Sequence, residues 1–218
     1  MTDRPIVFSA PMIRALLDGR KSQTRRALKP QPICHVGAVP SFSWGRYHGL
    51  YPDDWFGYGN EIDGALPYRP GDRLWVREAY SGPYAMGDIP PRDWRADLPV
   101  WYWADGNPED GDWTKPKPGI HMPRWASRLT LIVTDVRVQR LQDISNEDAI
   151  AEGTEPHGHA FTGYGKQSDV WMAPYYSFAI LWTSIHGPDA WDANPWVAAI
   201  SFETHKCNID QMPGGDHE

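Results

Sequence analysis

The sequence predicts an α+β protein: a small mixed or antiparallel β-barrel with helices packed outside it and two long loop-rich insertions. Its 218 residues include 20 glycines and 21 prolines, more than the roughly 12% of average usage. We therefore expect an irregular, loop-rich globule and not a helical bundle. The predicted elements run strand, helix, strand, long strand, helix, helix, strand. Because consecutive crossover helices between strands are missing, a doubly wound parallel sheet is disfavoured.

Strand and helix patterns alternate in the first 80 residues. The apolar run at residues 5–8 predicts a short buried strand, and the apolar residues of Ala10–Leu17 recur at helical spacing. Gly19 is expected to end that helix. Residues 72–78 alternate polar with apolar side chains after a Pro-Gly turn signal, which predicts a second strand.

The second half of the chain predicts one long strand, two helices and a closing strand. Residues 129–141 carry apolar side chains at alternate positions, with a shift of phase that indicates a bulge or a bend. Ser145 is placed to begin a short helix that runs through Glu152, and residues 175–186 predict an amphipathic helix. Residues 196–202 predict the final strand, and we expect the four predicted strands to share one mixed sheet.

The sequence predicts a single domain over residues 1–206, with insertions at about 36–68 and 82–120 and a flexible tail over 207–218. Both insertions are rich in Gly, Pro and aromatic residues. As free linkers they would expose a large apolar area. We therefore expect them to fold back over the barrel and to wall its pocket.

The net charge and the number of cysteines exclude several classes of protein. The net charge of −7 argues against non-specific coating of nucleic acid. Residues 1–30 and 115–140 each carry five more basic than acidic side chains, so they form either a local anion-binding face or two solvated faces. Two cysteines are too few for a disulfide framework, and no apolar run approaches the ~18 residues of a membrane span. We expect a soluble, cytoplasmic protein.

The sequence contains no motif for a bound metal or nucleotide cofactor. A phosphate loop, a Gly-x-Gly-x-x-Gly motif and a His-Glu-x-x-His motif are all missing. His157 and His159 flank a glycine and could together hold a metal, but further ligands at suitable spacing are missing. A solvated loop is the preferred interpretation, and we expect no metal and no cofactor.

The most informative segment is Gly-Arg-Lys-Ser-Gln-Thr-Arg-Arg at residues 19–26. In a strand, Lys21 and Thr24 would point to opposite faces. In a turn or a helical cap they would share a face, and the ammonium group could reach the hydroxyl. The alternative is a polar helix exit whose basic groups lie in water.

This segment resembles the Gly-Arg-Lys-Thr-x-Thr-x-Arg motif of the ASCH domain family, whose members have a PUA-like barrel. Residues 70–77 resemble the Gly-Asp strand of that family, residues 141–153 its helix after the long strand, and residues 194–202 its closing strand. With residues 119–128 included, the pattern is similar to the longer phage and prophage members. The resemblance covers most of residues 5–205 in outline and implies a PUA-like mixed barrel.

An enzyme class in this family, the small bacterial N4-acetylcytidine amidohydrolase, uses a Lys, a Thr and a Glu. Lys21 and Thr24 match the first two by motif, and Glu152 matches the third by its place in the helix. The resemblance implies that Thr24 attacks the acyl group of an N4-acylated cytosine nucleoside or base, without a metal. Lys21 would act as its base, which requires burial or a cationic neighbour to lower the lysine pKa. Glu152 would position Lys21 or relay the proton to the departing amine.

A pyrimidine substrate needs aromatic walls and polar groups around it. Other ASCH and PUA-like proteins bind RNA or modified bases without catalysis, so a non-catalytic binding module for RNA or a modified nucleobase is the alternative function. The expected partner is a small modified nucleoside or nucleobase, with RNA as a further possibility and no membrane. The expected substrate-binding residues are Arg20, Arg25, Arg26, Trp75, Glu78 and Trp196.

Overall fold

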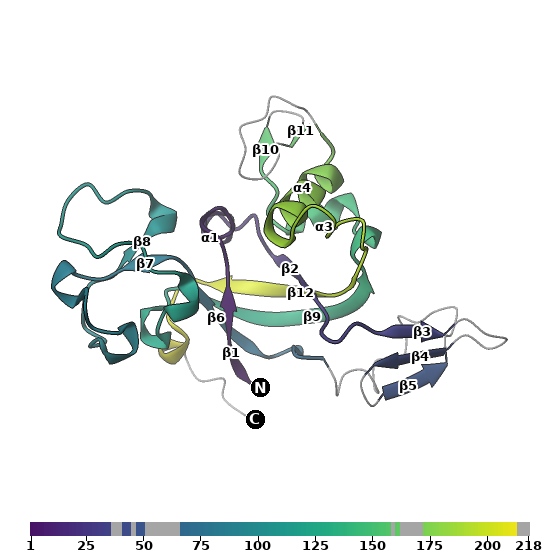
Figure 1. Ribbon diagram of the computed structural model, residues 1–218, viewed down its shortest axis with the longest axis horizontal. Coiled ribbons are helices and arrows are strands. Elements are labelled where there is room, and N and C mark those ends of the chain that lie inside the picture. Colours follow the sequence, from purple (N-terminus) through teal and green to yellow (C-terminus); the bar gives the residue numbers. More distant parts are fainter. Residues whose placement is uncertain (36–40, 45–46, 51–65, 158–159, 162–171, 213–218) are drawn as a thin grey trace. The chain divides into compact units, whose positions relative to one another are not determined.

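The computed structural model combines helices and strands, as the α+β class predicts (Figure 1). The residues that it describes are 1–35, 41–44, 47–50, 66–157, 160–161 and 172–212. The chain divides into two compact units, each assembled from segments that are distant in sequence. Unit 1 takes its described residues from Met1–Lys21, Gly71–Ile132 and Glu203–Glu218, and unit 2 from Ser22–Pro70 and Val133–Phe202. The expected single domain stays a prediction.

Five strands form one mixed sheet. They are β1 (Asp3–Val7), β2 (Gln23–Ala27), β6 (Arg73–Arg77), β9 (Thr130–Arg140) and β12 (Trp196–His205). Their order in the sheet is β1-β6-β9-β12-β2. Strand β1 runs parallel to β6, whereas β6 with β9 and β12 with β2 are antiparallel pairs. The four strands predicted from sequence therefore share one mixed sheet, as expected. A closed barrel stays a prediction.

Unit 1 contains the first helix, α1 (Ala10–Leu17), whose bounds match the sequence prediction. Ser9 precedes it in an extended conformation and Pro11 lies in its first turn, where a missing N–H costs nothing. Gly19 follows with φ of +74°, a left-handed conformation that glycine adopts readily. The helix buries Ile13, Ala15 and Leu16.

The second insertion folds within unit 1. Strand β7 (Tyr80–Ser81), just before the insertion, pairs with β8 (Trp101–Tyr102) inside it, and Trp94 of the insertion forms a buried cluster with Tyr80, Met122 and Ala126. The Tyr80 and Trp94 rings meet edge to face, with 5.9 Å between centroids. The insertion is therefore packed and is not a free linker. The short 3₁₀ helices of unit 1 are η2 (Tyr84–Met86), η3 (Pro91–Asp93), η4 (Trp103–Asp105), η5 (Gly119–His121), η6 (Arg124–Ala126) and η8 (Ile209–Gln211).

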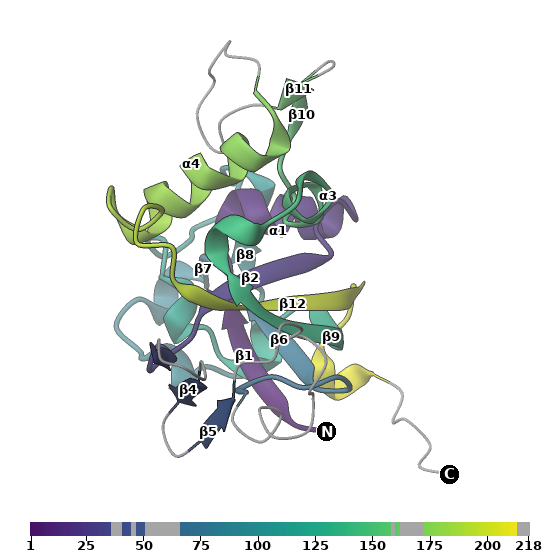
Figure 2. The same cartoon turned by 90° about the vertical axis from the view of Figure 1, so that its right-hand side faces the viewer.

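Within its described residues, unit 2 contains the helices α3 (Asn146–Ala151) and α4 (Pro174–His186), which lie next to each other in Figures 1 and 2. Ser145 Oγ accepts a hydrogen bond from the Asp148 N–H at 3.1 Å, so the predicted cap of α3 is confirmed. No described helix is both long and apolar enough to cross a membrane. The other elements of unit 2 are β3 (Ile33–His35), β4 (Ser41–Trp44), β5 (Tyr47–Leu50), η7 (Leu141–Asp143), β10 (Pro156–His157) and β11 (Ala160–Phe161).

Part of the first insertion is described. Strands β3, β4 and β5 form an antiparallel three-stranded sheet. Residues 51–65, which include Trp55 and Phe56, lie outside the described residues. Whether the insertions wall a pocket of the barrel stays a prediction.

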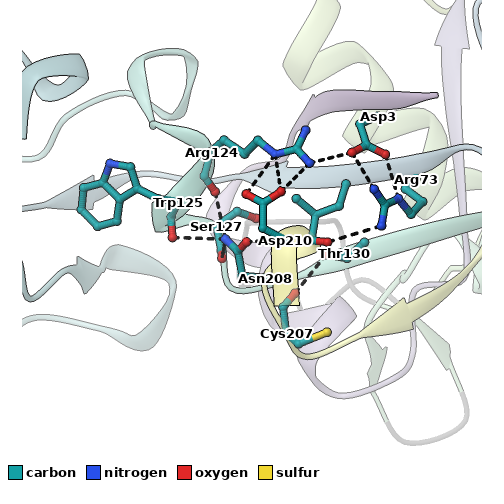
Figure 3. A network of polar contacts seen from close by, with 10 residues as sticks. Asp3, Arg73, Arg124, Trp125, Ser127, Thr130, Cys207, Asn208 and Asp210 are labelled. Carbon is teal, nitrogen blue, oxygen red and sulfur yellow. Dashed lines mark hydrogen bonds and ion pairs between the residues drawn. The ribbon is translucent and has the colours of Figure 1, made fainter. Parts of the chain in front are cut away.

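An ionic cluster joins the two chain ends of unit 1 (Figure 3). Arg124 donates to both Asp3 and Asp210 at 2.6 Å, and Arg73 donates to both carboxylate oxygens of Asp3 at 2.7 Å. Asn208 Nδ2 donates to three backbone carbonyl oxygens, those of Arg124, Trp125 and Ser127. The first residues of the predicted flexible tail are thus anchored, and Ile209 is buried.

Candidate functional site

Lys21 is the last residue of the first segment of unit 1, and it is almost fully buried, with 1% exposed. The turn at Gly19 brings the Lys21 N–H to the Ala15 carbonyl oxygen, at 3.0 Å. The ammonium nitrogen lies 5.5 Å from the centroid of the Phe8 ring. The polar helix exit with basic groups in water, one of the sequence interpretations, is therefore wrong for Lys21.

Thr24 lies in β2 of unit 2, opposite Ile200 of β12, and is 3% exposed. The Gln23 and Arg25 side chains hydrogen-bond to each other at 2.6 Å, so they share one face of β2, and strand alternation turns Thr24 to the other face. The strand interpretation is thus confirmed from Gln23 onward. That Thr24 meets Lys21 stays a prediction.

Glu152 ends α3 as its C-cap residue and is 2% exposed. Gly153 follows with φ of +89°, which lets the chain leave the helix. The Ser22 N–H donates to the Ala151 carbonyl oxygen at 2.8 Å. This bond holds the start of β2 against the end of α3, and Glu152 lies beside the Arg25 side chain of that strand.

The charged side chains of this region form what we call the ionic row: Arg137, Asp148, Arg25 and Glu152. Arg137 Nη2 donates to both oxygens of Asp148 at 3.0 and 3.1 Å. Arg25 Nη2 donates to Asp148 Oδ2 at 2.7 Å, and Arg25 Nη1 donates to Glu152 Oε1 at 3.2 Å. The row alternates positive and negative charges across β9, α3 and β2, all within unit 2.

Two pKa shifts show how burial acts on this region. Burial alone would raise the pKa of Asp148, but Arg137 and Arg25 outweigh it and the pKa is lowered. Burial lowers the pKa of the Arg26 guanidinium, against the opposing influence of Tyr68 and Glu152. The charges of β2 and α3 are therefore electrostatically coupled.

The other expected substrate-binding residues have their own partners. Arg20 pairs with Asp18 at 3.0 Å near the surface of unit 1. Glu78, also in unit 1, accepts from Arg128 at 2.9 and 3.0 Å. Burial raises the pKa of Glu78, and Arg128 opposes that shift.

The two expected aromatic walls are buried beneath arginines. The Arg77 guanidinium lies 4.3 Å from the centroid of the Trp75 ring in unit 1, and Arg140 lies 4.5 Å from that of Trp196 in unit 2. Of the expected site residues, the structure links Arg25 directly to Glu152. Trp75 and Glu78 belong to one unit, and Arg25, Arg26 and Trp196 to the other.

Sequence reasoning missed the residues that hold Arg25. Gln23, Asp148 and Arg137 all take part, and Asp148 is four residues before Glu152 on the same face of α3. From that spacing, the sequence could have predicted that the two carboxylates share one cation. Arg137 had no local signal, since its partner lies 11 residues away on another element.

Unit 1 holds a groove of about 660 Å³ in the second insertion, lined in part by Tyr84, Asp88, Lys115, Lys117 and His121. Among the described residues, no three His, Cys, Asp or Glu side chains are placed to hold a metal ion. His159 lies outside the described residues.

Comparison of the chain with protein-family models, with curated proteins and with solved structures found no match of any kind.

Proposed function

We propose that the protein is an amidohydrolase that removes an acyl group from an N4-acylated cytosine nucleoside or base. The proposal assigns the chain to the ASCH family and its five-stranded sheet to a PUA-like barrel. Lys21, Thr24 and Glu152 carry the chemistry. The observation that supports it best is that all three polar side chains are 3% exposed or less, although Lys and Glu are among the residues least often buried.

In the proposed reaction, Thr24 Oγ1 attacks the acyl carbonyl carbon while its proton passes to the Lys21 amine. The bond between that carbon and N4 then breaks, and the departing cytosine amine takes up a proton that Glu152 relays. Water hydrolyses the resulting acyl-threonine ester and releases the carboxylic acid. Burial is the condition that this scheme requires of Lys21, because a lysine accepts a proton once desolvation disfavours its charged form.

The test is to incubate the purified protein with N4-acetylcytidine and to follow its conversion to cytidine by ultraviolet absorbance. Lys21→Ala and Thr24→Ala should each lower the rate about 10²–10⁴-fold, the scale for a positioned acid–base group. Lys21→Arg should also fail, because a guanidinium stays protonated. Ser22→Ala is the matched control: it removes a neighbouring exposed hydroxyl and should keep full activity.

A wild-type protein that binds the nucleoside without hydrolysing it would overturn the proposal and favour the alternative, a non-catalytic module for RNA or a modified nucleobase. In that case the same substitutions should weaken binding in a graded way. Full activity in Lys21→Arg would overturn the role of Lys21 as base even if hydrolysis is observed.

A further inference from the structure

We propose that Arg25, held in turn by Asp148, is a positioning residue that fixes the orientation of the Glu152 carboxylate. This inference rests on the proposed function for the part played by Glu152 in the reaction. The contact between Arg25 and Glu152 does not depend on that function, because it is a property of unit 2 alone.

The Arg25 guanidinium is held from several directions. Its side chain is 0% exposed, and Nη1 donates to Gln23 Oε1 at 2.6 Å as well as to Glu152. Nη2 donates to Asp148 at 2.7 Å. The Phe178 ring of α4 lies 5.7 Å from the guanidinium carbon. A planar group with these contacts is held in place, and its bond to Glu152 Oε1 restrains that carboxylate oxygen.

Gln23 reinforces this arrangement from the same face of β2. Its Nε2 donates to Asp148 Oδ1 at 3.3 Å and to Ser201 Oγ at 3.2 Å. Its amide oxygen is thereby turned toward Arg25. Residues of β2, α3 and β12 thus hold the Arg25 guanidinium against Glu152. A lysine at position 25 could not reproduce these contacts, because an ammonium group is a point charge without a planar fork.

The ionic row becomes more buried along its length. The exposed fraction of the side chain falls from 43% in Arg137 to 18% in Asp148, 0% in Arg25 and 2% in Glu152. The Asp148 side chain bonds Arg25, Gln23 and Arg137, and through Arg25 it acts on the Glu152 carboxylate. This separation allows the positioning role to be tested without altering the contact between Arg25 and Glu152.

The experiment compares Arg25→Lys and Asp148→Asn with Arg124→Lys as the matched control. Arg124 also bridges two carboxylates, those of Asp3 and Asp210, but in the cluster at the chain ends of unit 1. With N4-acetylcytidine as substrate, we expect kcat to fall about 10- to 100-fold in Arg25→Lys, the scale for a displaced catalytic group. We expect a smaller fall, about 3- to 10-fold, in Asp148→Asn. KM should stay within about twofold in both, and Arg124→Lys should match the wild type.

A second measurement does not need activity. The NMR order parameter of the Glu152 side-chain methylene groups should fall in Arg25→Lys and in Asp148→Asn, and should stay unchanged in Arg124→Lys. Folded variants with wild-type order parameters and wild-type kcat would overturn the positioning role. If the wild type does not hydrolyse the nucleoside but the order parameters fall as expected, the proposed function fails while the positioning of Glu152 stands. If Arg25→Lys does not fold, Asp148→Asn alone decides.

Discussion

Arg25 in unit 2 and Arg124 in unit 1 each bridge two carboxylates, but they do so in different surroundings. The Arg25 side chain is 0% exposed and its partner Glu152 is 2% exposed. Arg124 is 37% exposed and its partner Asp210 is 56% exposed (Figure 3). The same ion-pair chemistry therefore acts in a low dielectric in one unit and beside water in the other.

Burial decides what each cluster contributes. A solvated pair is screened and stabilises by about 0–1 kcal/mol. Breaking a buried pair leaves a charge with neither partner nor water, which costs about 3–5 kcal/mol. The exposed cluster therefore serves to anchor the chain ends. Substitution of any one of its residues should lower the free energy of unfolding only slightly. The buried part of the ionic row holds its side chains in fixed positions, because a buried charge that moves away from its partner is strongly destabilising.

The largest expected effect is that of Arg25→Leu. It removes from the buried Glu152 the cation that Arg25 supplies, so the free energy of unfolding should fall by about 3–5 kcal/mol in urea denaturation. The double variant Arg25→Leu/Glu152→Leu, which removes both charges, should be less destabilised than the single one. If Arg25→Leu lowers the free energy of unfolding by less than about 1 kcal/mol, the two clusters do not differ as described.

Arg128→Ala should have an intermediate effect. Arg128 bonds the buried Glu78 on one side and the more exposed Asp105 on the other, at 2.7 and 2.8 Å. Its loss should lower the free energy of unfolding by about 1.5–3 kcal/mol, the range for hydrogen bonds to charged groups. Arg128→Lys should recover part of this loss. Denaturation curves of both variants check the prediction, and a cost equal to that of an exposed pair would contradict it.

Arg124→Gln should cost about 1 kcal/mol or less, because its pairs with Asp3 and Asp210 are partly in water. Raising the salt concentration should reduce the difference from the wild type, since solvated charges are screened. Arg25→Leu should show a much weaker salt dependence. Urea denaturation of both variants at low and high salt tests this, and equal salt dependence would contradict the assignment of buried and exposed clusters.

The smallest expected effect concerns the acid dependence of stability. The pKa of Asp148 is lowered from 3.8 in the folded protein, because Arg137 and Arg25 outweigh burial. Such a carboxylate stabilises the fold above its unfolded pKa, and the contribution is lost as the pH falls through the lowered pKa. Asp148→Asn should therefore flatten the decline in stability below about pH 4, by less than about 1 kcal/mol. If chemical denaturation shows the same decline in stability at low pH for Asp148→Asn and the wild type, the lowered pKa of Asp148 is contradicted.

The sequence alone determined the local elements. Helix α1 is correct at both ends, because apolar residues at helical spacing, a proline in the first turn and Gly19 act within a few residues of one another. The start of α3 is also correct, because Ser145 accepts a hydrogen bond from an N–H only three residues away, and the helix ends at Ala151, one residue before the expected Glu152. Strands β6 and β9 were also predictable, since apolar side chains recur at alternate positions of the sequence, although burial in β6 does not alternate and extends to Trp75.

Only the tertiary structure decided where the polar side chains of Gln23–Ala27 would lie. This stretch has no apolar alternation, and sequence reasoning left it open between a strand, a turn and a solvated helix exit. It forms a buried strand because its partners come from far along the chain: Asp148 and Glu152 are 123 and 127 residues from Arg25, and Ser201 is 178 residues from Gln23. A charge can be buried only where an opposite charge or a hydrogen-bond partner meets it, and that condition depends on how the chain folds back.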